Sequence, residues 1–227
     1  MKKIILILVL LVVLTSCKRV DAAATEACDG CLAFYFENPQ PDNDSELNGF
    51  PSKFKGLYKN SDSSFIRIEE DRILKEYFFK FKVHRQKMDS LKSEYDLVDG
   101  KLITKDTKDK FDIKIVGDSI ELSKKRIDTI FRFSLNQKAK RVEGQLVLSR
   151  RDSIFWTIQT IALEKNILKI KDIYLQEDLK KLDSVTQIKG KMLDSTSCLI
   201  KPTRREFKNI LKIKHLGTQQ QFDKVLK

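Results

Sequence analysis

Residues 111–122 read FDIKIVGDSIEL, and their pattern decides the fold class of this chain. Apolar and polar residues alternate over residues 111–115 and again over residues 120–122, which is the two-residue period of a β-strand. Between them, residues 116–119 (VGDS) are typical of a tight turn. Alternation of this kind predicts strands that bury one face only, and such strands form antiparallel sheets.

Similar segments recur along the chain, at residues 65–68, 77–83, 130–133, 145–148, 154–163 and 167–170. The joins between them are short, and Asp99-Gly100 is a good hairpin signal. Gly56, Gly100 and Gly144 lie 44 residues apart and Gly190 follows after 46, which indicates either related hairpins or a coincidence. We therefore predict a mainly β (α+β) fold, built as an antiparallel β-meander or an open barrel, with a helix packed on it.

Two helices are expected near the C-terminus. Residues 172–185 place leucines at helical spacing. Thr203 and Glu206 form the pattern of a capping box just after Pro202, and Gly217 is a fitting stop. The second helix would have one apolar face, made of Phe207, Ile210 and Leu211, and one basic face, made of Arg204, Arg205, Lys208, Lys212 and Lys214. We expect the apolar face to pack on the sheet, with an anionic membrane surface as the alternative.

The N-terminus has the layout of a secretory signal. Lys2 and Lys3 precede an apolar run over residues 4–14, and small residues lead to Cys17. Eleven apolar residues are too few to span a bilayer, which needs about 20. Residues 14–17 (LTSC) resemble the lipobox of bacterial lipoproteins. The resemblance implies that residues 1–16 are removed, that Cys17 carries the lipid, and that Lys18 directs the protein to the outer membrane, on either face.

Charge divides the mature chain into two parts. Residues 21–50 hold seven acidic residues and no lysine or arginine, whereas residues 51–227 hold 40 basic and 25 acidic residues. We interpret residues 17–50 as an acidic tether with a CxxC motif, whose apolar segment 32–36 could dock on the body. Residues 51–227 are interpreted as a single β-rich domain. The excess of basic residues in this body either keeps the protein soluble or forms a surface that binds anionic lipid or polysaccharide. We expect no nucleic-acid partner, because the protein lies outside the cytoplasm.

The cysteines predict a disulfide rather than a redox or zinc site. Cys28 and Cys31 lack the preceding strand and following helix of a thioredoxin-type motif. Thiols outside the cytoplasm tend to oxidise, so either Cys28 pairs with Cys31 or one of them pairs with Cys198. Zinc would need more ligands, and His84 and His215 are isolated in the sequence.

The sequence contains no recognisable catalytic motif. It has no Gly-x-Ser-x-Gly, HExxH or Walker pattern, and the recurrent Asp-Ser and Asp-Thr pairs are typical of turns rather than calcium loops. We therefore assign no catalytic, cofactor-binding or metal-binding residue, expect no cofactor, and expect that the protein is not an enzyme.

With its lipobox, its CDGC segment at residues 28–31 and its IKPTRREFK segment at residues 200–208, the mature chain resembles small envelope lipoproteins of Gram-negative bacteria. That resemblance implies no particular activity. The leading hypothesis is a membrane-anchored, non-catalytic binding or structural module with an envelope protein, lipid or polysaccharide as partner. The alternative is a lipocalin-like carrier or an enzyme that uses a barrel interior.

Overall fold

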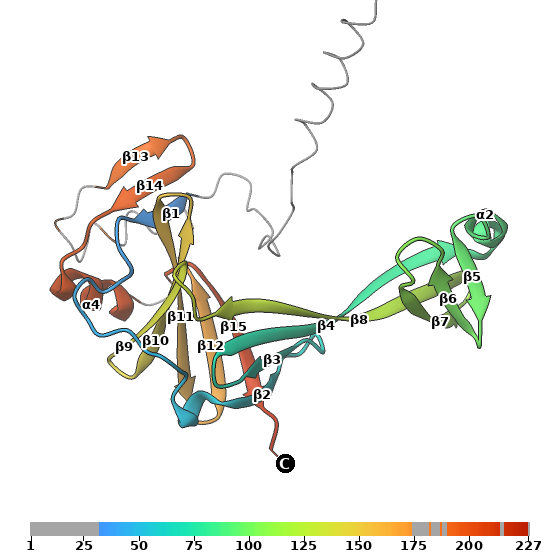
Figure 1. Cartoon of the computed structure of the whole chain (residues 1–227), viewed down its shortest axis with the longest axis horizontal. Coiled ribbons are helices and arrows are strands. Elements are labelled where there is room, and N and C mark those ends of the chain that lie inside the picture. Colours follow the sequence, from blue (N-terminus) through green and yellow to red (C-terminus); the bar gives the residue numbers. More distant parts are fainter. Residues whose placement is uncertain (1–31, 174–181, 183–186, 188–189, 214–215, 227) are drawn as a thin grey trace, which may run out of the picture.

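The computed structural model describes residues 32–173, 182, 187, 190–213 and 216–226. It confirms the mainly β prediction, because most of the described residues belong to one open, mostly antiparallel sheet of fifteen strands (Figure 1). Neighbouring strands follow the order β13-β14-β1-β11-β12-β15-β2-β3-β4-β8-β7-β6-β5, and β10 joins β11 to β9. The exception to antiparallel pairing is β1 beside β14.

The strands before residue 100 are β1 (Ala33–Phe36), β2 (Gly56–Lys59), β3 (Phe65–Ile68), β4 (Arg72–His84) and β5 (Tyr95–Val98). The central strands are β6 (Lys101–Thr104), β7 (Lys110–Val116), β8 (Ser119–Arg132), β9 (Gln137–Val142) and β10 (Gln145–Asp152). The last strands are β11 (Phe155–Glu164), β12 (Ile167–Asp172), β13 (Lys191–Asp194), β14 (Ser197–Ile200) and β15 (Thr218–Lys224). Short helices are η1 (Ser52–Phe54), η2 (Arg85–Lys87), α2 (Met88–Leu91) and α4 (Arg204–Lys212).

Two unusually long strands give the molecule its shape. β4 and β8 pair along their whole lengths of 13 and 14 residues, and β5, β6, β7 and α2 are inserted between them in the chain. Figure 1 shows the result: a large body, the main lobe, and a small second body, the distal lobe, joined by a two-stranded ribbon. We define the arm as residues 77–79 of β4 and 124–126 of β8, where each strand has no other strand partner within the described residues.

Each lobe has its own apolar core. The main lobe contains two clusters of buried side chains, one around Phe54, Tyr58 and Ile161 and one around Phe36, Trp156 and Phe207. The distal lobe contains a third and smaller cluster, made of Leu102, Phe111, Ile120 and Leu122. The arm lies between these separate cores, and within it β4 and β8 pair only with each other.

Residues 32–50 are part of the main lobe. β1 supplies Phe34 and Phe36 to the second main-lobe core, and Phe50 lies in the first. The loop after β1 is held by the buried Lys140. Its Nζ donates hydrogen bonds to the carbonyl oxygens of Pro39 (3.0 Å) and Pro41 (2.7 Å). Burial lowers the pKa of the Lys140 ammonium.

Helix α4 confirms the predicted C-terminal helix. The Thr203 side chain accepts a hydrogen bond from the Glu206 amide, and the Glu206 carboxylate accepts one from the Thr203 amide (2.9 Å). Phe207, Ile210 and Leu211 are buried in the main lobe, so the apolar face packs as expected. Three residues of its basic face pair with acidic side chains of the main lobe: Arg204 pairs with Asp44, and the Nζ atoms of Lys208 and Lys212 lie 3.9 and 3.8 Å from Oε1 of Glu143. Lys214 lies outside the described residues.

The predicted helix stop at Gly217 is wrong. Helix α4 ends at Lys212, with Ile213 as an extended cap residue. Gly217 instead lies before β15 with a φ of 66°, a conformation that favours glycine. The other helix predicted, over residues 172–185, falls largely outside the described residues. None of the helices in the described part of the chain has the length and apolar character needed to span a bilayer.

Candidate functional site

The ribbon of β4 and β8, which includes the arm, carries side chains on two faces of different character. Directly opposed residues share a face, so the pairings Tyr77–Arg126, Phe79–Lys124 and Phe81–Leu122 place these six side chains together. That face is aromatic and leads into the distal core. On the other face, Lys80 and Lys82 follow Phe78 at two-residue spacing, which makes it basic.

Aromatic contacts run from the arm into the distal lobe. The rings of Phe79 and Phe81 lie 5.7 Å apart, and those of Phe81 and Phe111 lie 5.6 Å apart in an edge-on arrangement. Arg126 lies 5.1 Å from the centre of the Phe79 ring, a cation–π contact. Phe78 and Phe79 nevertheless expose 46% and 40% of their surface, so the arm offers aromatic area to a partner.

A buried carboxylate fixes the base of the arm. Glu76 lies 2.6 Å from Nη2 of Arg67 on β3 and 2.7 Å from Nζ of Lys125 on β8, so its two oxygens join three strands. The hydrogen bond from Lys125, together with Arg67, holds the pKa of the Glu76 carboxyl below its ordinary value. These ion pairs therefore link the start of the arm to β3 in the main lobe.

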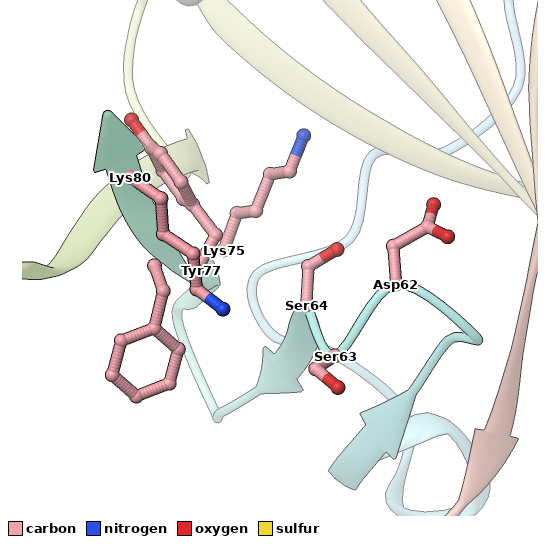
Figure 2. A pocket seen from close by; sticks show the side chains of 7 residues that line it. Asp62, Ser63, Ser64, Lys75, Tyr77 and Lys80 are labelled. Atoms are coloured by element: carbon pink, nitrogen blue, oxygen red, sulfur yellow. The ribbon is translucent and has the colours of Figure 1, made fainter. Parts of the chain in front are cut away.

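An open pocket of about 310 Å³ lies where the β2–β3 turn meets β4 (Figure 2). The turn supplies the carboxylate of Asp62 and the hydroxyls of Ser63 and Ser64, and β4 supplies Lys75, Tyr77, Phe78 and Lys80. Burial and a hydrogen bond with Asp128 raise the pKa of the Tyr77 phenol, so Tyr77 stays neutral. The pocket combines one carboxylate, two hydroxyls and two lysines with aromatic side chains, an arrangement that suits binding a polar group.

Backbone groups along one edge of β4 also point outward. Arg72 accepts a hydrogen bond from the Glu69 amide on the β3 side, and Arg85 donates one to the Asp118 carbonyl on the β8 side. Because these directions alternate along an antiparallel strand, even-numbered residues of β4 face the β3 side. β3 ends its pairing at Glu76, so Phe78, Lys80 and Lys82 direct their amides and carbonyls toward an edge that no described strand covers.

The apolar face of the distal lobe is only partly covered. Leu91 of α2 packs against it together with Tyr95 and Ile113. Strand register places Leu97 beside Leu102, and Ile115 beside Ile120, on this same face. Leu97 and Ile115 are 66% and 62% exposed, so the face extends beyond the cover that α2 provides.

The residues predicted as sites do not come together as one centre. Cys17, Cys28, Cys31 and His215 lie outside the described residues, so the disulfide stays a prediction with its alternatives. Cys198 is buried in the main lobe opposite Phe34, whereas His84 is exposed at the far end of β4. Within the described ranges, no group of three or more His, Cys, Asp or Glu side chains is arranged to hold a metal ion.

Comparison with known proteins explains the N-terminus. Residues 1–17 match the family described as prokaryotic membrane lipoprotein lipid attachment site, and the match ends on Cys17. The chain is a membrane-anchored lipoprotein. No curated protein and no solved structure gives a significant match.

Sequence reasoning identified 77–83 as a strand but missed the arm. The signal was present, because Phe78 and Phe79 are adjacent and two lysines follow at alternate positions, so this strand has no wholly polar face. An adjacent aromatic pair in an otherwise alternating strand places one ring on each face. The sequence does not indicate which strand pairs with residues 77–83.

Proposed function

We propose that this lipoprotein is a non-catalytic binding module of the cell envelope that holds its distal lobe out on the arm to engage an envelope protein. The observation that carries the proposal is the incompletely covered apolar face of the distal lobe, with Leu97 and Ile115 exposed. A lobe with so small a core of its own is stabilised when a partner covers the remaining apolar surface.

The position of the anchor supports this orientation. Fourteen residues separate Cys17 from Leu32, and β1 begins next to Leu32 in the main lobe. The lipid therefore holds the main lobe, while the arm extends the distal lobe from it (Figure 1). We further propose the outer membrane as its location, because Lys18 follows the lipidated cysteine; separating the membranes by density and probing for the protein tests this.

A carrier or an enzyme with a barrel interior has less support. The main-lobe interior is filled by large side chains, among them Phe54, Tyr58 and Ile161, which have no exposed surface. The membrane-surface alternative for α4 is also weaker, since three of its basic residues pair with Asp44 and Glu143. A protein partner at the distal lobe, in contrast, would bind the exposed apolar face around Leu97 and Ile115.

The test is site-specific photo-crosslinking in living cells. A photoreactive residue replaces Leu97 or Ile115, and a matched control replaces Leu135, which is 85% exposed in the β8–β9 turn of the main lobe. We expect one dominant protein adduct from the two distal positions and not from position 135. The proposal fails if the three positions give the same adducts, or if the distal positions yield lipid or polysaccharide instead.

Two variants sharpen this experiment. Leu97→Arg places a charge on the apolar face at an already exposed position, so the lobe should fold and the adduct formed from position 115 should weaken. Cys17→Ala removes the anchor, and we expect it to reduce crosslinking by removing the protein from the membrane surface. An adduct that survives Leu97→Arg unchanged would contradict recognition through the apolar face.

A further inference from the structure

The outer edge of β4 is long, exposed and unpaired. From Tyr77 to His84 it has no strand beside it in the described part of the chain, and this length exceeds the mean strand of about five or six residues. The outward amides and carbonyls of Phe78, Lys80 and Lys82 are spaced to bond a neighbouring strand. Exposed edges of this kind are templates for strand addition by another chain.

We propose that this edge binds an extended segment of a partner protein that alternates acidic and apolar residues and adds to the sheet as an antiparallel strand. The proposal rests on the binding function proposed above and gives its mode of recognition. The direction follows from the sheet, since β3 and β8 both run antiparallel to β4. The added strand would continue the line of β3, with one end at the pocket beside the β2–β3 turn (Figure 2).

The two faces of β4 select the side chains of the partner. Residues opposite Lys80 and Lys82 share their basic face, so acidic side chains are favoured there. Residues opposite Phe79 and Phe81 share the aromatic face, so apolar side chains are favoured at the intervening positions. Over residues 75–82 and 121–128 the two strands carry six basic and three acidic side chains, and one of the three, Glu76, is already bonded to Arg67 and Lys125.

The same charges argue against a second copy of this chain. Two β4 edges paired antiparallel around Lys80 would place that lysine opposite its counterpart, and Lys82 opposite Phe78. Like charges placed directly opposite each other destabilise a strand pair. Lys80 shares the pocket at the start of this edge with Asp62, and its Nζ lies 3.9 Å from Glu121, which lies toward β8 rather than at the open edge. An acidic partner strand therefore fits this edge better than self-association.

The probe is a fluorescent eight-residue peptide of alternating glutamate and valine, titrated onto the full lipidated chain in detergent and followed by anisotropy. We expect saturable binding that weakens with added salt, and at least tenfold weaker binding of a lysine–valine peptide. Binding should also slow amide hydrogen exchange in residues 77–84. Equal binding of the two peptides, or no binding of either, would overturn the proposal.

Backbone recognition is tested by methylating the peptide. In antiparallel pairing the glutamates lie opposite Phe78, Lys80 and Lys82 and exchange hydrogen bonds with them, so methylating the glutamate nitrogens should abolish binding. Methylating the valine nitrogens alters the opposite edge of the peptide and should leave binding within about twofold. The reverse result would overturn the antiparallel arrangement.

A matched pair of proline variants tests the edge on the protein. Lys80→Pro removes an outward amide of β4, and Ile127→Pro removes one on the outer edge of β8, across the same ribbon. Proline is tolerated where the amide it replaces faces solvent. We expect Lys80→Pro to lower peptide affinity at least tenfold and Ile127→Pro to leave it unchanged. Lys80→Gln removes the charge but keeps the backbone amide, so it separates the two contributions of this residue. Thermal unfolding of each variant checks that it is folded.

The two proposals fail separately. If a dominant partner crosslinks to the distal lobe and Lys80→Pro leaves that adduct unchanged, the strand-addition proposal is overturned while the binding function stands. If the distal positions crosslink to no protein, the binding function is overturned whatever the peptide does. Loss of the partner adduct in Lys80→Pro and its retention in Ile127→Pro support both.

Discussion

At the scale of single residues, Glu76 links the arm to the main lobe through ion pairs with Arg67 and Lys125. Its pKa is lowered in the folded protein, so the stabilisation is present above the ordinary glutamate pKa of about 4.3 and is lost as the pH falls through the folded value. Glu76→Gln should therefore destabilise the protein at pH 7 by roughly 1–3 kcal/mol and have a smaller effect in acid. Urea unfolding across pH 3–7 measures this difference.

The control for that prediction is Glu164→Gln. Glu164 at the end of β11 pairs with Lys169 of β12, but the Glu164 side chain is 61% exposed. An exposed ion pair contributes little, so this variant should unfold almost as the parent does at every pH. If both variants behave alike, the three-strand ion pair does not stabilise the base of the arm.

Thr203 offers a second test at this scale, because its side chain caps the first turn of α4. Thr203→Ala should lower the free energy of unfolding by about 1 kcal/mol, since one amide of the first turn loses its partner. Thr203→Ser keeps a capping hydroxyl and should recover most of that loss. Chemical denaturation of the three proteins provides the comparison, and an alanine variant as stable as the parent would show that the cap is dispensable.

At the scale of elements, the strand least visible in the sequence is β15. Its residues 218–221 (TQQQ) have no apolar alternation, and Phe222 is its only buried residue. β15 nevertheless lies between β12 and β2 and joins them in one sheet. Its place depends on Gly217, where an added Cβ would overlap the carbonyl oxygen of Asp172.

Gly217→Ala should therefore destabilise the protein by at least about 2 kcal/mol, from backbone strain and from the clash together. Gly144→Ala is the matched control, because Gly144 also has a positive φ of 86° but has no neighbour within 4 Å of an added Cβ. We expect that control to cost about 1 kcal/mol, from strain alone. Equal losses in urea unfolding would show that close packing at Gly217 does not matter.

At the scale of the whole molecule, separate cores joined by a two-stranded arm predict separate unfolding of the lobes. Phe111 packs on Phe81 and Tyr95 in the distal core, so Phe111→Ala should remove about 3–5 kcal/mol from that lobe. Hydrogen exchange followed by mass spectrometry should show loss of protection in β5, β6 and β7, with β10, β11 and β12 unchanged.

The reciprocal variant is Ile161→Ala in the main-lobe core, where Ile161 has no exposed surface. It should weaken protection in β10, β11 and β12 at a comparable energetic cost. Loss of protection through both lobes in Phe111→Ala would contradict two independent cores. It would also weaken the idea that the arm presents an autonomous distal lobe.

Features that depend on local chemistry can be predicted from the chain alone. The lipobox at residues 14–17, the alternation at 111–122 and the capping box at Thr203 each rest on neighbouring residues, so each could be identified from the chain alone. Asp99-Gly100 likewise forms the predicted turn. Both residues have positive φ angles there, which Asp-Gly pairs adopt readily in two-residue hairpin turns.

The choice of strand neighbours, and with it the edges that stay open, depends on long-range contacts that local patterns do not specify. The parallel pairing of β1 with β14 joins residues more than 160 positions apart, and β4 pairs with β8 although β5, β6 and β7 lie between them in the chain. A two-residue period specifies a strand and its faces but not its neighbour, since backbone hydrogen bonds are the same for every residue pair. The arm, the open edge of β4 and the distal face arise from that choice of neighbours.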